Sequence, residues 1–192
     1  MRLPLLNFVS YGSLPVTLKK DIMDTSHTDL LPADFAGNSR AWIYQAHRLF
    51  TLPEALAIEG VLENFVRDWQ SHGTPVKGYG NLFYGQFIVL IADETASGVS
   101  GCSTDSSVRL IKQIEQQTGV QLFDRLNLAF YVQQKVQLVP LAQLPYALEN
   151  GLIQPDTLYF DNTVQTKLEL ETKWLSPMKY TWLGQRYLKI KA

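Results

Sequence analysis

The sequence predicts an α+β fold: a single domain over residues 26–192, with a ferredoxin-like split βαβ core, a mixed or antiparallel sheet and extra C-terminal elements. Three observations predict it. Between residues 41 and 132 the segments follow in the order strand, helix, strand, strand, helix, strand, which is typical of a split βαβ unit. Hydrophobic residues make up 46% of the 192 residues and charged residues 18%, as in an ordinary globular core. Apolar residues keep helical or strand spacing from Arg40 onwards.

The first strand and helix are indicated by local signals. Residues 41–45 (AWIYQ) are aromatic and β-branched, which favours a strand. Thr51 and Glu54 then have the spacing of a capping box, so a helix is expected to begin after Thr51. The helix shows apolar residues at intervals of three and four, and Gly73 is its expected end.

Two strands over residues 76–84 and 86–93 are expected to form a hairpin that turns at Gly85. The second strand contains six consecutive apolar residues, Phe87–Ala92. A strand that is apolar on both sides is typical of a central strand covered on both faces. Asp93 and Glu94 would therefore emerge at the end of the sheet.

The remaining elements follow from caps and short apolar runs. Ser103, Thr104, Asp105 and Ser106 predict the start of a second amphipathic helix that ends at Gly119. Residues 162–175 fit either a helix capped by Asn162 or Thr163, or a strand. The other expected elements are strands at 126–132, 135–139 and 157–160, and a short helix at 141–150 that is bent near Pro145.

Residues 1–25 are expected to form a flexible extension, because Pro4, Gly12 and Pro15 break every periodic pattern there. Met23 offers a second start for the chain. No segment contains 18 consecutive apolar residues, so no membrane span is predicted. Without a clear secretory signal or paired cysteines, the expected compartment is the cytoplasm.

Composition excludes several classes of function. The 17 basic and 18 acidic side chains leave a net charge of −1, which argues against a nucleic-acid partner. A single cysteine, Cys102, excludes an internal disulfide and a multi-cysteine metal site. The three histidines form no HExxH or His-x-His pattern, so neither a metal nor a cofactor is predicted.

The segment Ile88–Glu94 looks like the Walker B element of ABC-type ATPases, in which the acidic residues serve Mg²⁺ and the attacking water. That chemistry also requires a phosphate-binding loop of the form Gly-x4-Gly-Lys-Ser/Thr. The chain has the Gly-x4-Gly spacing twice, at Gly73 and Gly78 and at Gly80 and Gly85, but no Gly-Lys pair follows. The sequence therefore argues against ATP hydrolysis.

Four segments together resemble an uncharacterised family of Bacteroidetes-type bacterial proteins whose members carry the label "ABC transporter ATPase". The resemblance spans residues 24–187, and it implies kinship and cytoplasmic residence but brings no activity or catalytic residue with it. Because only the Walker-B-like piece is present, the label itself is not expected to describe this chain. The four segments are Ser39–Gln45, Gln86–Glu94, Gly101–Val108 and Asn162–Lys167.

Cys102 is the most reactive residue type in the chain, and it is expected directly before a helix. Orphan amides and the helix dipole at such a position lower the pKa of a thiol and attract anions. Ser103, Thr104, Asp105 and Ser106 follow in the same turn, beside Asp93 and Glu94. The alternative is a small cysteine packed beneath an ordinary N-cap.

Two classes of function follow from this turn. The first is a non-catalytic binding or interaction module for a small anionic ligand or a protein partner. The second is an enzyme with Cys102 as its nucleophile. The first is favoured because a nucleophilic enzyme needs a positioned base, and no histidine lies near Cys102 in the sequence.

Overall fold

The computed structural model describes residues 26–93 and 101–188, and the contacts within the chain divide it after Leu31 into two units. The first unit contributes one described helix, α1 (Ser26–Asp29). All other elements belong to the second unit, which begins at Pro32. The expected extension at residues 1–25 and the predicted site residue Glu94 lie outside the described residues.

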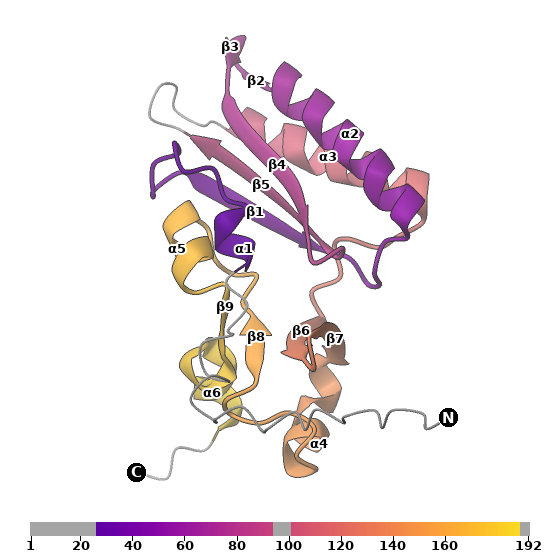
Figure 1. Cartoon of the computed structure of the whole chain (residues 1–192), viewed down its shortest axis with the longest axis vertical. Coiled ribbons are helices and arrows are strands. Elements are labelled where there is room, and N and C mark those ends of the chain that lie inside the picture. The colour runs from indigo at the N-terminus through magenta and orange to yellow at the C-terminus, as the bar shows by residue number, and fades with distance from the viewer. Residues whose placement is uncertain (1–25, 94–100, 189–192) are drawn as a thin grey trace, which may run out of the picture. The chain divides into compact units, whose positions relative to one another are not determined.

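The first sheet contains three strands in the order β1-β5-β4, and each neighbouring pair is antiparallel (Figure 1). Helix α2 connects β1 to β4, so these two strands run parallel with β5 between them. The α+β class is therefore confirmed, and three of the four strands predicted for the split βαβ core form this sheet. The elements are β1 (Arg40–Gln45), α2 (Leu52–Asp68), β4 (Lys77–Phe83) and β5 (Phe87–Asp93).

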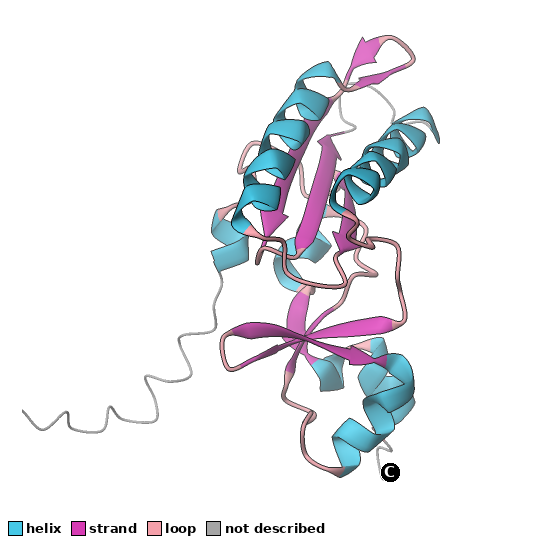
Figure 2. Cartoon of the chain, turned by 90° about the vertical axis from the view of Figure 1, so that its right-hand side faces the viewer, coloured by secondary structure: helices cyan, strands magenta, loops and turns pink. Residues whose placement is uncertain are grey.

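Strand β5 is covered on both faces, as its continuous apolar run predicted, and every one of its residues is buried. Helices α2 and α3 (Gly101–Thr118) lie on one face of the sheet, where Ile88 and Leu90 join the core formed by these helices (Figure 2). On the other face the ring centroid of Phe87 lies 4.6 Å from that of Phe160 and 5.3 Å from that of Trp174.

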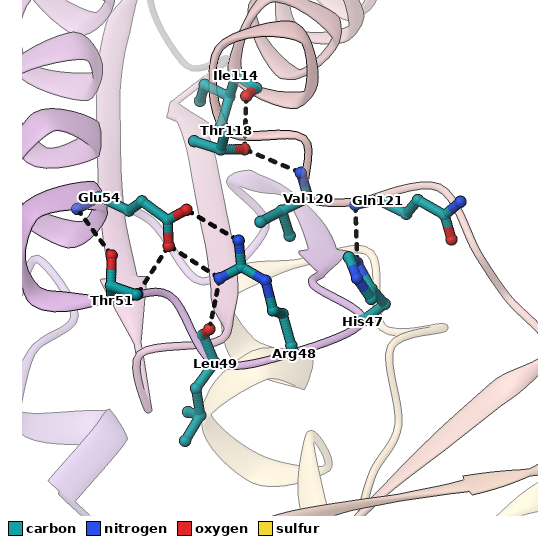
Figure 3. A network of polar contacts seen from close by, with 9 residues as sticks. All are labelled: His47, Arg48, Leu49, Thr51, Glu54, Ile114, Thr118, Val120 and Gln121. Carbon is teal, nitrogen blue, oxygen red and sulfur yellow. Dashed lines mark hydrogen bonds and ion pairs between the residues drawn. The ribbon is translucent and has the colours of Figure 1, made fainter.

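The start of α2 has the predicted capping box, and its end differs from the prediction. Thr51 Oγ1 accepts a hydrogen bond from the Glu54 amide, and Glu54 Oε2 accepts one from the Thr51 amide (Figure 3). The helix ends at Asp68 rather than at Gly73, because Trp69 adopts an extended conformation and buries its ring. Gly73 instead occupies the turn between β2 (Gln70–Ser71) and β3 (Thr74–Pro75), with a φ of 78°.

The second sheet is also antiparallel and has the order β7-β6-β8-β9. The strand after α3 belongs to this sheet and does not extend the first one. Segment 162–175 contains a helix, α5, capped by Thr166 rather than by Asn162 or Thr163. The elements are β6 (Asn127–Val132), β7 (Lys135–Pro140), η2 (Leu141–Gln143), α4 (Leu144–Glu149), β8 (Leu158–Phe160), α5 (Lys167–Thr172), β9 (Leu175–Pro177), η3 (Met178–Tyr180) and α6 (Trp182–Tyr187).

Two of the four glycines that matched the spacing of a phosphate-binding loop have a packing role. Gly78 and Gly80 lie in β4, beneath α2. A Cβ atom at Gly78 would lie 2.6 Å from Cε3 of Trp69, and one at Gly80 would lie 3.3 Å from Cγ2 of Val66. The spacing of these glycines therefore lets α2 approach β4 closely.

Gly78→Ala should lower the free energy of unfolding by about 1–3 kcal/mol, because the added methyl group overpacks the contact with Trp69. The matched control is Gly60→Ala, within α2, where a Cβ atom meets nothing within 4 Å. This control should raise stability by about 0.5–1 kcal/mol. Urea unfolding measures both changes, and equal values for the two variants would contradict the packing role.

Glu54→Gln should flatten the acid branch of the stability profile. Hydrogen bonds from Arg48, and then from the Thr51 amide, lower the pKa of Glu54 from 4.5 to about 2. A carboxyl with a depressed folded-state pKa stabilises the fold above its unfolded pKa, and this stabilisation is lost as the pH falls through about 2. Between pH 4.5 and about 2, the free energy of unfolding should fall less for Glu54→Gln, and for Arg48→Gln, than for the parent. Urea unfolding at several pH values in this range measures the difference. An unchanged slope in both variants would refute this account of the capping box.

Candidate functional site

The residues of the predicted turn lie in the first turns of α3, which begins at Gly101 and not at Ser103 or Thr104. The side chains of Cys102 and Ser103 lie outside the described residues. Asp105 is exposed. The Thr104 carbonyl accepts a hydrogen bond of 2.7 Å from Ser107 Oγ, and this buried hydroxyl also lies 3.2 Å from the Tyr44 hydroxyl. Part of the predicted turn is therefore occupied in anchoring α3 to β1.

Asp93 ends β5 and is only 5% exposed, so its carboxylate is buried rather than presented to a ligand. Lys77 lies opposite it on β4, with Nζ 3.5 Å from Asp93 Oδ2 and 3.0 Å from Asp34 Oδ2. The hydrogen bond between Lys77 and Asp34 raises the pKa of the ammonium group and lowers the pKa of the Asp34 carboxyl. The charge of Asp93 is thus balanced within the fold by a lysine with a second acidic partner.

Ser106 lines a groove between α2 and α3 with a volume of about 520 Å³. Its hydroxyl accepts a hydrogen bond of 3.1 Å from Arg109 Nη2. Asp68 and Arg109 both line the groove, so their opposite charges offset each other. Of the predicted site residues with described side chains, Ser106 alone contributes to this groove.

A second cavity, also of about 520 Å³, lies along the outer edge of β1, where the two sheets approach each other. No sequence-predicted site residue with a described side chain lines it. Its walls come from β1, the segment that joins α3 to β6, the start of β6, β8, the loop before α5, and α6. The lining residues are Arg40–Gln45, Leu122–Arg125, Asn127, Leu128, Tyr159, Asn162–Gln165 and Trp182.

A chain of side-chain hydrogen bonds forms the polar wall of this cavity. Gln45 Nε2 donates to the carbonyl oxygen of Asn127 at 2.9 Å, and Gln45 Oε1 accepts from Asn162 Nδ2 at 2.8 Å. Asn162 Oδ1 in turn accepts from Trp174 Nε1 at 2.9 Å. Gln45 is 7% exposed, so its amide is buried and satisfied on both sides. The network joins β1 to the first residue of β6 and to the loop before α5.

The cavity exists because the chain after α3 begins to pair with β1 and then leaves it. The Gln121 amide donates to His47 Nδ1 at 2.9 Å (Figure 3). The His47 amide donates to the Gln121 carbonyl at 3.0 Å. In a complete ferredoxin-like sheet the next strand would continue along β1. Here it diverges after Gln121, and Asn127 meets β1 only through the Gln45 side chain.

Two arginines give the side chains that line this cavity a net positive charge. Within the described residues neither Arg40 nor Arg125 makes an ion pair, and the guanidinium of Arg40 lies 5.2 Å from the ring centroid of Trp42. Asp124 also lines the cavity, but its oxygens accept hydrogen bonds from the Leu126 amide at 2.8 Å and from Asn127 Nδ2 at 2.6 Å. Its carboxylate is thus held within its own loop.

The phenol groups at this site are neutral acids held in apolar surroundings. Burial raises the pKa of Tyr44, against smaller opposing effects of its hydrogen bond with Ser107 and of the Arg125 charge. Burial also raises the pKa of Tyr159, and the nearby charge of Asp161 adds to this effect. Both hydroxyls therefore stay protonated at neutral pH and can act as hydrogen-bond donors.

The sequence held one indirect signal for this cavity. Two of the four segments that carry the family resemblance, Ser39–Gln45 and Asn162–Lys167, meet here. They are joined by backbone hydrogen bonds from the Ala41 amide to the Gln165 carbonyl and from the Lys167 amide to the Ser39 carbonyl, both of 2.8 Å. Because the two segments lie far apart in the sequence, no local pattern predicts that they are in contact.

Comparison with known proteins adds no identity: no family model, no curated protein and no solved structure matches the chain. In the part of the chain that the structure describes, no three His, Cys, Asp or Glu side chains gather in a way that could hold a metal ion. None of the helices described here is both long and apolar enough to cross a membrane.

Gln45→Leu should lower the free energy of unfolding by about 2 kcal/mol, because it leaves the Asn162 amide and the Asn127 carbonyl without their partner. Gln116→Leu on the exposed side of α3 is the matched control and should change stability by less than about 0.5 kcal/mol. Urea unfolding of the two variants checks this. Equal stability of the two would show that the network does not hold the sheets together.

Proposed function

We propose that this protein is a binding module whose cavity at the outer edge of β1 takes a small anionic ligand. The observation that carries this proposal is the pair of arginines, Arg40 and Arg125, that line a cavity of about 520 Å³ without an ion pair among the described residues. This volume lies within the range of about 300–1,000 Å³ typical of ligand sites.

Guanidinium groups favour an anionic ligand for a geometric reason. Their planar fork of N–H donors matches the two oxygens of a carboxylate or the oxygens of a phosphate. The rings of Tyr159, Trp182 and Phe123 offer apolar contact area next to the arginines. A ligand with an anionic group and an apolar body would therefore find complementary partners.

The groove between α2 and α3 is a weaker candidate for the same function. Asp68 offsets Arg109 there, and the Ser106 hydroxyl is hydrogen-bonded to Arg109. The proposal accordingly moves the anion site from the predicted turn at 102–107 to the edge of β1. The kinship with the Bacteroidetes-type family and the cytoplasmic location stay predictions.

Thermal shift tests the proposal directly. The probes are inorganic phosphate, mono- and dicarboxylates, N-acyl amino acids, sugar phosphates and nucleotides. We expect at least one probe to raise the melting temperature of the parent, since binding to the folded state alone stabilises it. Arg40→Gln and Arg125→Gln should each weaken the binding of that probe by about tenfold or more.

Ser106→Ala and Arg109→Gln are the matched controls, because they remove the same kinds of groups from the other groove. Both controls should keep the shift of the parent. The proposal fails if no probe shifts the parent. It also fails if the shift survives in both β1-edge variants and disappears in Ser106→Ala, which would return the site to the start of α3.

A further inference from the structure

The outer edge of β1 exposes backbone hydrogen-bonding groups to the cavity. In an antiparallel strand both backbone groups of a residue point to the same side, and successive residues alternate. The Ala46 amide bonds to the Gln86 carbonyl on the β5 side, and the Ala41 amide bonds to the Gln165 carbonyl on the opposite side. The N–H and C=O of Ile43 therefore point away from β5.

Ile43 lines the cavity, and within the described residues β1 pairs over this stretch with β5 alone. The edge is closed at both ends of this stretch. Ala41 bonds to Gln165 at one end, and His47 bonds to Gln121 at the other. Six residue steps at about 3.3 Å each leave roughly 20 Å of strand edge between these two contacts.

The open stretch of edge between these two contacts lies where the next strand of a ferredoxin-like sheet would pair with β1. The structure uses the Gln45 side chain, rather than a strand, to span from β1 to Asn127. The nitrogen and the oxygen of the Gln45 carboxamide both have hydrogen-bond partners already, so this polar wall offers a ligand few further contacts. In the part of the chain that the structure describes, no strand pairs with the backbone groups of Ile43 that point away from β5, and a peptide amide is their natural complement.

We propose that the ligand of this cavity is a short extended peptide with a free C-terminal carboxylate. Its backbone pairs with Ile43 as an added strand, and its carboxylate binds the arginines Arg40 and Arg125. This inference rests on the proposed function and specifies the chemical class of its ligand.

The walls of the cavity decide between a short peptide and a second protein sheet. Leu122–Arg125 and Asn162–Gln165 line the cavity together with β1, so the edge of this strand lies in a recess. A long edge strand of another sheet needs a flat, open approach, whereas an extended peptide of three residues, about 10 Å long, fits within this stretch of edge. The positive balance of Arg40 and Arg125 matches the terminal carboxylate.

The test uses the full chain labelled with ¹⁵N and pools of acetylated tripeptides. In each pool one position is fixed and the other two are randomised, so that every side chain is sampled. We expect at least one pool to move the backbone amide signal of Ile43 more than those of Trp42 and Tyr44, whose amides face β5. Arg40→Gln or Arg125→Gln should weaken the binding of the most strongly bound pool by about tenfold.

Two modified pools separate the parts of the proposal. A C-terminal carboxamide removes the anionic group, and methylation of the backbone nitrogens removes the donors that would pair with Ile43. Each change should weaken binding about tenfold or more. If no tripeptide pool moves the Ile43 signal while a small anion still binds through the arginines, the peptide inference is wrong and the proposed function stands. If neither peptides nor anions bind, both are wrong.

Discussion

The carboxamide of Gln45 is the interaction on which the rest of the site depends. It extends from an edge strand and bonds at once to the first residue of β6 and to Asn162 in the loop before α5. A buried amide with both halves satisfied is stabilising, whereas one that loses a partner is costly. Gln45 therefore fixes where the chain after α3 can approach β1, and Asn127 meets it through a side chain rather than through a strand.

The apolar contacts around this network give the second sheet its place in the same unit. Phe160 of β8 and Trp174, which directly precedes β9, cover the face of β5 that α2 and α3 leave open, with ring centroids 5.2 Å from each other. Burial of such rings supplies most of the favourable free energy, and the hydrogen bond from Trp174 to Asn162 links that core to the cavity wall. Hydrophobic packing thus brings the sheets together, while directional amide bonds set the open edge between them.

Much of the fold could be predicted from the sequence because its signals are local. The capping box at Thr51 and Glu54 lies within a single turn of chain, and Gly119 and Gly85 each adopt the positive φ that their positions in a helix end and a hairpin turn require. Local signals place the end of α2 too late, at Gly73, because the burial of Trp69 against Gly78 depends on a strand further along the chain.

The candidate site could not be predicted in this way, because it is formed by contacts between segments that lie far apart in the sequence. The strand pattern around Leu128 and Phe130 fits either sheet, so periodicity alone could not exclude β6 from the first one. The sequence places Asp93 at the end of the sheet, and only the register of β4 against β5 shows that Lys77 lies opposite it. The cavity depends on residues far apart in the sequence, such as Gln45 and Asn162, which are 117 positions apart and meet only in three dimensions.

Among the described residues no strand pairs with the outer edge of β1 between Ala41 and His47, and amide hydrogen exchange of the ligand-free protein measures this residue by residue. The amides of Trp42 and Tyr44 should be protected by β5, and that of Ala41 by its bond to the Gln165 carbonyl. The Ile43 amide should exchange faster than all three, by about tenfold or more, although it lies between them in the same strand. Protection of Ile43 equal to that of Trp42 and Tyr44 would contradict the account, because another part of the chain would then already occupy the edge.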